Sequence, residues 1–216
     1  MAITVIAPTI LSKDPAAYKQ IIKTYYPFAK HVHIDVSDGS LTSEVTIPES
    51  AVWWPRGWTV DIHMMTANPS QHVDTLIKLH PNLVIFHAEA KEDLLPVFNK
   101  LKDNGMKVGV ALVKDIYPGS IKSILSAVDH ALIFSGTLGK YGGTADLLLL
   151  EKAALIREIH GNIELGWDGG ANLENTKILT HGGIDVINVG SAIAKSPDPA
   201  KSYAALEAET ENEDPL

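Results

Sequence analysis

Histidine and aspartate side chains stand in three strand-like segments and together have the composition of a transition-metal site. His33 and Asp35 lie in one segment, His63 lies in the next, and Asp168 ends a third segment far along the chain. Two imidazoles and two carboxylates suit one divalent ion such as Zn, Fe(II) or Mn. A lone His-x-Asp is more often a satisfied polar pair, but here separate strand ends supply matching ligand types. The pattern therefore predicts a candidate metal centre.

Strand periodicity places these side chains on common faces. Side chains alternate across a strand, so His33 and Asp35 share one face of segment 31–36. Asp61, His63 and Met65 likewise share one face of segment 59–65. A His or Asp that points into an apolar interior is costly unless it is paired or binds a metal. The shared faces therefore favour convergence of the candidate ligands.

Glycine-rich turns are the second feature that could do chemistry. Gly139 to Gly143 follow the sixth strand-like segment, Gly169-Gly170 follow the seventh, and Gly190-Ser191 follow the eighth and lead toward a short helix. Backbone N–H groups in such turns bind phosphate. The alternative is that these glycines only allow tight turns between strands and helices, and both interpretations stay open here.

The elements that must position these residues form a regular alternation. Short β-branched runs are separated by longer amphipathic segments, and the helix after the second strand is weak because Pro48, Pro55 and Gly57 interrupt it. Asn68-Pro69 and Asp198-Pro199 are typical helix openings. The predicted strands are 3–10, 31–36, 59–65, 83–88, 107–113, 130–135, 163–167 and 185–189. The predicted helices are about 14–29, 69–80, 91–104, 118–127, 146–160, 172–181 and 198–208.

Eight strand–helix units without a long linker indicate a parallel sheet, for which two closures compete. An open doubly wound sheet of the dinucleotide-binding type should carry Gly-x-Gly-x-x-Gly after its first strand, and segment 7–12 contains no glycine. The count of eight and the chain length favour a single-domain (β/α)8 TIM barrel, whose active site lies at the carboxyl ends of the strands. We expect the barrel to span residues 1–206 and the acidic tail 207–216 to be disordered.

Composition excludes several functional classes. The chain has 216 residues, 45% of them hydrophobic, and no cysteine, which rules out a disulfide scaffold, thiolate zinc sites and cysteine nucleophiles. The net charge is −8, but five of the 26 acidic residues lie in the last ten, so the body is nearly neutral and has no basic footprint for nucleic acid. No signal-like or membrane-spanning run is present, so we expect a cytoplasmic protein without membrane contact.

Several of these motifs, in this order and spacing, resemble the ribulose-phosphate 3-epimerase family. The resemblance runs from about residue 5 to residue 205, and its motifs are APTILS (7–12), HIDVSDG (33–39), DIHMM (61–65), FHAEA (86–90), NGMKVG (104–109), DGG (168–170) and GSAI (190–193). It implies an isomerase of pentose phosphate metabolism, built as a (β/α)8 barrel, that interconverts D-ribulose 5-phosphate and D-xylulose 5-phosphate. It also suggests a homo-oligomer.

The resemblance assigns roles to individual residues. It implies that His33, Asp35, His63 and Asp168 hold one divalent metal ion, and that Asp35 and Asp168 are the catalytic acid–base pair. These two would exchange the C3 proton through a cis-enediolate, as inversion requires bases on opposite faces of the carbon. The residues implied in binding the phosphorylated ketose are Thr9, His63, Met65, Gly142, Gly143, Gly169, Gly170, Gly190 and Ser191.

Departures from the family pattern keep other functions open. Thr9 stands where the family usually has Ser, Ser37 stands where it has an apolar Met near the reacting carbon, and the loops after strands 2 and 6 differ. Lys140 in the latter loop is either a phosphate ligand or a solvated lysine, and His87 is either a core residue or a residue behind the metal centre. Another ketose phosphate such as allulose 6-phosphate, or a non-catalytic sugar-phosphate-binding paralogue, are the alternatives. A decarboxylase or hexulose-phosphate synthase is disfavoured because the sequence has no Asp-x-Lys-x-x-Asp.

Overall fold

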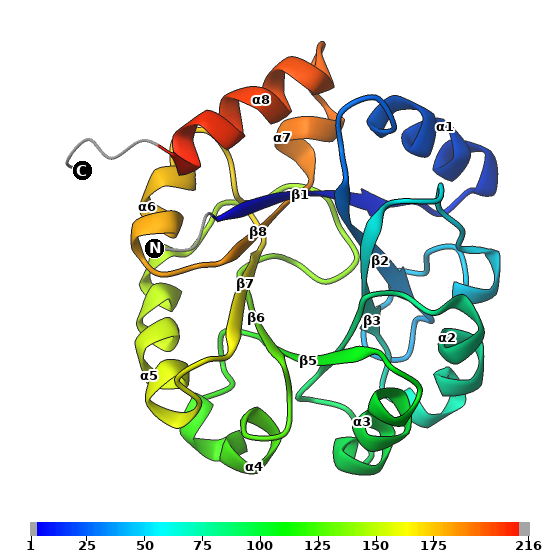
Figure 1. Cartoon of the computed structure of the whole chain (residues 1–216), viewed down its shortest axis with the longest axis vertical. Coiled ribbons are helices and arrows are strands. Elements are labelled where there is room, and N and C mark those ends of the chain that lie inside the picture. Colours follow the sequence, from blue (N-terminus) through cyan, green and yellow to red (C-terminus); the bar gives the residue numbers. More distant parts are fainter. Residues whose placement is uncertain (1–3, 212–216) are drawn as a thin grey trace.

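A closed barrel of eight parallel strands forms the centre of the protein, as the computed structural model of residues 4–211 shows (Figure 1). Each strand pairs with the next in sequence, and the eighth pairs with the first, which closes the cylinder. The strands are β1 (Val5–Leu11), β2 (His31–Ser37), β3 (Thr59–Met65), β4 (Leu83–His87), β5 (Lys107–Leu112), β6 (His130–Phe134), β7 (Glu164–Asp168) and β8 (Val186–Val189). The predicted TIM barrel is confirmed.

Helices form an outer ring around this barrel (Figure 1). They are α1 (Pro15–Tyr25), α2 (Val73–Leu79), α3 (Leu94–Asp103), α4 (Lys122–Leu125), α5 (Glu151–Ile159), α6 (Thr176–His181), α7 (Ser191–Ala194) and α8 (Pro199–Thr210). Short 3-10 helices precede α2, α4 and α5: η2 (Pro69–Gln71), η3 (Pro118–Ile121) and η4 (Leu147–Leu150). Between β2 and β3 the structure has only the 3-10 helix η1 (Glu49–Ala51), as the interrupting prolines predict.

The hydrophobic core lies mainly between the barrel and the helices, and the barrel interior is partly polar. Outward-facing branched residues of the strands pack against the helices in one large cluster. Inside the barrel, a small apolar cluster consists of Leu83, Ile85, Ala111 and Leu132. The rest of the interior contains several buried histidines and aspartates. Buried polar groups are costly without partners. The polar part of the barrel interior is therefore the place to look for a functional site.

Helix ends follow the expected chemistry in most places. The Asp198 side chain accepts a hydrogen bond from Lys201 N–H at 3.1 Å, and Gly105 adopts φ +80° just after α3. The predicted opening at Asn68 is wrong in one respect, because its side chain caps nothing and Pro69 starts a 3-10 turn rather than an α-helix. The side chain of Asn68 is therefore not needed to begin this segment.

The last helix extends beyond the expected boundary at residue 206. α8 continues to Thr210, so residues 207–210 are helical rather than disordered. Ala and Glu are good helix formers, and Tyr203 and Leu206 bury the helix against the barrel, which explains the extra turn. Glu211 forms the C-terminal cap of α8, and residues 212–216 of the predicted tail lie outside the described residues. Within 4–211, every helix is too short or too polar to cross a membrane.

Candidate active site

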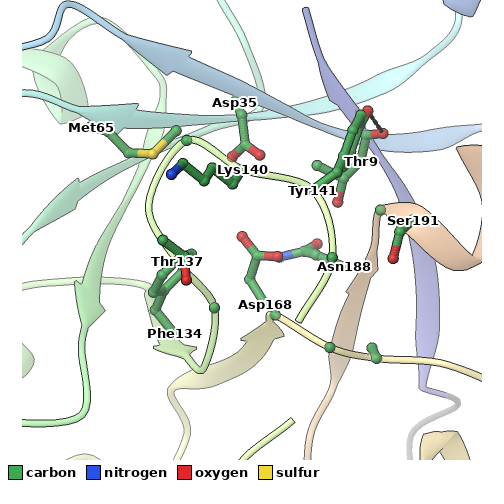
Figure 2. A pocket seen from close by; sticks show the side chains of 17 residues that line it. Thr9, Asp35, Met65, Phe134, Thr137, Lys140, Tyr141, Asp168, Asn188 and Ser191 are labelled. Carbon is green, nitrogen blue, oxygen red and sulfur yellow. Dashed lines mark hydrogen bonds between the residues drawn. The ribbon is translucent and has the colours of Figure 1, made fainter. Parts of the chain in front are cut away.

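Strand pairing brings the predicted ligands together at the carboxyl end of the barrel. Asp35 of β2 lies opposite His63 of β3 in the parallel register, and His33 lies opposite Thr9 of β1. Asp168 reaches the same place as the last residue of β7. Figure 2 shows Asp35 and Asp168 pointing toward each other across a cavity. The convergence that strand alternation predicts is therefore found in the structure.

The four side chains form one compact cluster of ligand atoms. One nitrogen or oxygen from each of His33, Asp35, His63 and Asp168 lies within 4.8 Å of the other three. His63 Nδ1 lies 3.0 Å from Asp35 Oδ1 and 3.7 Å from Asp168 Oδ2. His33 Nε2 lies 3.4 Å and 3.6 Å from the same two oxygens. The four atoms therefore lie close around one point, although His63 Nδ1 and Asp35 Oδ1 are also within hydrogen-bond distance.

This spacing fits a divalent transition metal. Tetrahedral zinc with bonds of about 2.0–2.1 Å places neighbouring ligand atoms roughly 3.3 Å apart, and the four imidazole–carboxylate separations bracket that value. His33 is fully buried, and neither of its ring nitrogens has a hydrogen-bond partner among the described residues. A buried imidazole without a partner is costly, and a metal ion would satisfy its Nε2. The donor set and the geometry therefore fit the ion that the ligand types suggest.

The two carboxyl groups have different proton affinities. Burial, together with the nearby charge of Asp35, raises the pKa of Asp168 to about 7. Burial also opposes ionisation of Asp35, but the imidazoles of His33 and His63 outweigh it and hold the pKa of Asp35 well below its usual range. Pairs of titratable groups whose pKa values are pushed apart are typical of acid–base catalysis. Before a cation binds, Asp35 is thus ionised at neutral pH, and Asp168 is near its titration midpoint.

A chain of polar contacts continues behind the metal centre. His63 Nε2 lies 2.7 Å from His87 Nε2, and the two rings stack with centroids 4.8 Å apart. His87 Nδ1 faces Glu89 Oε2 at 3.4 Å. Histidine ligands commonly use their second nitrogen to contact a group that fixes ring orientation. Of the two interpretations of His87, the one behind the metal centre matches its position.

Most of the predicted binding residues line the cavity between the strand ends. The predicted residues in its wall are Thr9, Asp35, Met65, Gly142, Asp168, Gly169, Gly170, Gly190 and Ser191. His33 and His63 are fully buried and lie outside the wall. Gly143 does not line the cavity either, and a Cβ on it would meet nothing within 4 Å. Most of the residues predicted from the sequence therefore line one cavity, and Gly143 lies outside it.

The two glycines after β7 are required by close backbone packing. Gly169 has φ +111°, and a Cβ there would lie 2.2 Å from the backbone nitrogen of Gly136. Gly170 has φ +70°, and its Cβ would lie 2.1 Å from the nitrogen of Ala145. L-residues rarely adopt these angles, and backbone atoms cannot move aside cheaply. The tight-turn interpretation thus holds for both, and both also lie in the cavity wall.

The loop after β6 folds across the cavity mouth. Tyr141 Oη donates to Thr9 O at 2.9 Å and accepts from Leu11 N–H at 2.8 Å, which ties the loop to the end of β1. Lys140 Nζ lies 3.4 Å from Glu44 Oε1, and Glu44 also pairs with Lys13. Only about 30 Å³ remains accessible to water inside, enough for no more than a few molecules. Lys140 is paired with Glu44 rather than being simply solvated, although its side chain stays 57% exposed.

Some site residues differ from the sequence-based expectation. Ser37, at the position where the family has an apolar Met near the reacting carbon, does not line the cavity, because its hydroxyl points to the following loop and donates to Glu44 O at 2.6 Å. Asn188, Tyr141 and Phe134 also line the cavity, although the sequence motifs do not indicate them. The available signal for Asn188 was a polar residue inside the β-branched run 186–189.

The sequence and the fold of this chain are similar to those of several known proteins. The profile of the Ribulose-phosphate 3 epimerase family matches residues 5–194. The chain is 31% identical over 211 residues to the ribulose-phosphate 3-epimerase of Helicobacter pylori strain J99, covering 94% of this chain and 96% of that protein. Identity to the Bacillus subtilis strain 168 ribulose-phosphate 3-epimerase is 27% over 210 residues, covering 93% and 97%. A solved 3-hexulose-6-phosphate synthase from Salmonella typhimurium gives a TM-score of 0.70 over 96% of this chain and 98% of that chain, but at 15% identity this shows the fold alone.

Proposed function

The chain belongs to the ribulose-phosphate 3-epimerase family, a family of isomerases, and from that premise we propose that it interconverts D-ribulose 5-phosphate and D-xylulose 5-phosphate. The single observation that carries the proposal is the cluster of His33, Asp35, His63 and Asp168 at the base of the cavity. It supplies both a site for a divalent ion and two carboxyl groups that face each other. Inversion at C3 needs both.

The cluster suits removal of a proton from a carbon next to a carbonyl group. When bound by these four side chains, a divalent ion such as Zn, Fe(II) or Mn would stabilise the negative charge that develops on the C2 and C3 oxygens of the substrate. His33 and His63 would hold the ion from the barrel interior, where both rings are fully buried. Such rigid placement keeps the ligand geometry fixed while the substrate changes.

The two aspartates would exchange the proton from opposite faces of C3. In one direction, ionised Asp35 removes the proton and protonated Asp168 delivers one to the other face, and in the reverse direction the roles exchange. The different proton affinities of the two groups support this division, since one is held ionised and the pKa of the other is raised to about 7. Their facing positions across the cavity supply the geometry for inversion (Figure 2).

The remaining wall would hold the rest of the ketose phosphate. Backbone groups of the turns after β7 and β8 and of the loop after β6 would bind the phosphate, through Gly142, Gly169, Gly170, Gly190 and Ser191. Gly143 would act only through the loop conformation. The apolar Met65 side chain would shield the reacting carbon, and the Thr9 hydroxyl, which has no partner among the described residues, would bind a substrate oxygen.

A coupled assay with metal-loaded protein tests this proposal. We expect turnover of D-ribulose 5-phosphate that is lost when a chelator strips the metal and returns when Zn, Fe(II) or Mn is added back. Allulose 6-phosphate and other phosphorylated ketoses belong in the same panel. Faster turnover of a hexulose phosphate would replace the proposed substrate, and ligand-induced thermal stabilisation without turnover on any substrate would contradict the enzymatic function.

A further inference from the structure

We infer that Asn188 determines substrate specificity by binding the hydroxyl group that lies between the reacting carbon and the phosphate, which is the C4 hydroxyl of a ketose 5-phosphate. The inference rests on the proposed function and extends it to a residue outside the proton-transfer and metal-binding set. It begins from an amide that the fold itself leaves without a partner.

The Asn188 side chain is buried and unsatisfied. The residue is 1% exposed, it lines the cavity, and its Oδ1 has no hydrogen-bond partner within residues 4–211. A buried amide without partners destabilises the folded protein, so its presence here indicates a role other than stabilising the fold. A ligand in the cavity would supply the missing hydrogen bonds.

The neighbouring strands offer this amide no structural role. Asn188 lies on β8, opposite Ala7 of β1 on one side and opposite Asp168 of β7 on the other. Ala7 has no polar side-chain atom, and no hydrogen bond joins Asn188 to Asp168 in the described part of the chain. Figure 2 shows the amide beside Asp168, in the wall that faces the cavity. The amide is therefore available to form hydrogen bonds with a ligand in the cavity.

Its position along the cavity identifies the substrate group. Asp168 marks the reacting carbon, while Gly190 and Ser191, two and three residues after Asn188, belong to the turn assigned to the phosphate. In a ketose 5-phosphate, only C4 with its hydroxyl and C5 lie between C3 and the phosphate. An amide both donates and accepts, as does a hydroxyl, so the pair can be fully satisfied. Sites built to bind a substrate hydroxyl strongly reject analogues that lack it.

A comparison of two substrates with two proteins tests the inference. We would measure kcat/KM of the wild type and of Asn188→Leu, a change that keeps size and removes polarity, on D-ribulose 5-phosphate and on its 4-deoxy analogue. The wild type should prefer the hydroxylated substrate by roughly 100-fold or more. The variant should lose about 30- to 100-fold on D-ribulose 5-phosphate and show a preference below about threefold. Its melting temperature should stay equal or rise, because an unsatisfied amide is removed.

Two further variants keep the result interpretable. Asn188→Ala removes the amide without any risk of overpacking, and it should show the same collapse of preference if Asn188→Leu does not fold. Ile187→Val lies on the same strand but in the core outside the cavity, and it should keep the full preference. Retention of the wild-type preference by both Asn188 variants would overturn the inference while leaving the proposed function intact. A wild type that turns over no ketose phosphate would overturn both.

Discussion

Asp35 and Asp168 are the same chemical group, and their neighbours make them different. Asp35 lies beside two imidazoles, which hold its pKa well below the usual range in spite of burial. For Asp168, burial is the largest effect, and together with the nearby negative charge of Asp35 it raises the pKa to about 7. This asymmetry provides a base and an acid from one residue type, which the catalytic proposal requires.

Amide variants of the two aspartates should separate proton removal from inversion. We expect Asp35→Asn and Asp168→Asn each to lower epimerisation about 10²- to 10⁴-fold, since each loses one proton-transferring group. Metal content, measured in the same samples, shows whether the ion is retained. In deuterated buffer, metal-loaded Asp168→Asn should still exchange the C3 proton of D-ribulose 5-phosphate without forming D-xylulose 5-phosphate. Turnover that survives both single changes would contradict the two-base mechanism.

His87 should control metal affinity through the orientation of His63. If Nδ1 of His63 binds the ion, its Nε2 carries the proton and donates it to His87 Nε2 at 2.7 Å. We expect His87→Phe to weaken binding of Zn about 10- to 100-fold in a chelator competition, because the ring of His63 loses its anchor. His87→Gln keeps an acceptor and should stay within about threefold of the wild type. Unchanged affinity of His87→Phe would show that His87 is only a core residue.

At this scale, the sequence predicts residues whose type is unusual for the position they occupy. His33, Asp35 and His63 are polar residues in otherwise β-branched strands, and alternation alone places them on the inner face. Asn188 and Tyr141 could not be predicted in the same way. Whether the Asn188 amide finds a hydrogen-bond partner depends on the residues opposite it on β1 and β7. The position of Tyr141 depends on the loop after β6, which folds back to β1.

Among the elements, the amino-terminal half of the barrel shows how strands are joined below the site. Asp61 of β3 is 2% exposed, its Oδ2 lies 2.5 Å from His31 Nε2 of β2, and its Oδ1 accepts from Asn82 Nδ2 at 3.0 Å. Burial opposes ionisation, but these partners lower the pKa of Asp61 below its usual value. The carboxylate therefore links β2, β3 and the segment before β4.

Replacing Asp61 should change both stability and its pH dependence. A lowered folded-state pKa contributes stability that is complete above the unfolded-state value of about 3.9 and is lost as pH falls through the folded-state value. We expect Asp61→Asn to lower the free energy of unfolding at pH 7 by about 2–3 kcal/mol in urea titrations. The variant should also lose less further stability than the wild type below about pH 4.

A surface pair provides the control for that experiment. Asp74 pairs with Lys100 at 2.7 Å, but the side chain of Asp74 is 79% exposed. Asp74→Asn should leave the urea midpoint unchanged, since exposed ion pairs contribute little. Equal effects of the two substitutions would show that Asp61 is not a structural link between the strands.

Elements were easier to predict than their ends. Each of the eight strands forms near its predicted place because runs of β-branched residues are separated by glycine and proline breakers. Observed helix ends differ from the predicted ends where tertiary packing determines the helix length. Helix α8, for example, continues to Thr210 because Tyr203 and Leu206 are buried against the barrel. Asn68 shows the opposite case, in which the expected cap contributes nothing because Pro69 opens a 3-10 turn.

For the whole molecule, the main question is how a substrate reaches a site that is partly covered by the loop after β6. Only about 30 Å³ between the strand ends and the loop after β6 is accessible to water, so we expect this loop to move when a ketose phosphate binds. Tyr141 connects this loop to β1 through two hydrogen bonds, while Lys140 connects it to Glu44 in the loop after β2. Exposed ion pairs are weak, so the buried tyrosine hydroxyl should be the main restraint on opening.

Tyr141→Phe should therefore open the loop without removing any group that contacts the metal ligands. Two lost hydrogen bonds of about 1 kcal/mol each would raise the population of the open loop roughly tenfold or more. Trypsin cleavage after Lys140, followed by mass spectrometry, measures that population when opening is fast relative to cleavage. A phosphorylated ketose should slow the cleavage in both proteins, because ligand binding favours the closed loop.

Tyr117→Phe changes a tyrosine that is 61% exposed and serves as the control. If cleavage at Lys140 is equally fast in wild type and Tyr141→Phe, the tyrosine hydroxyl does not restrain the loop, and access must be limited elsewhere.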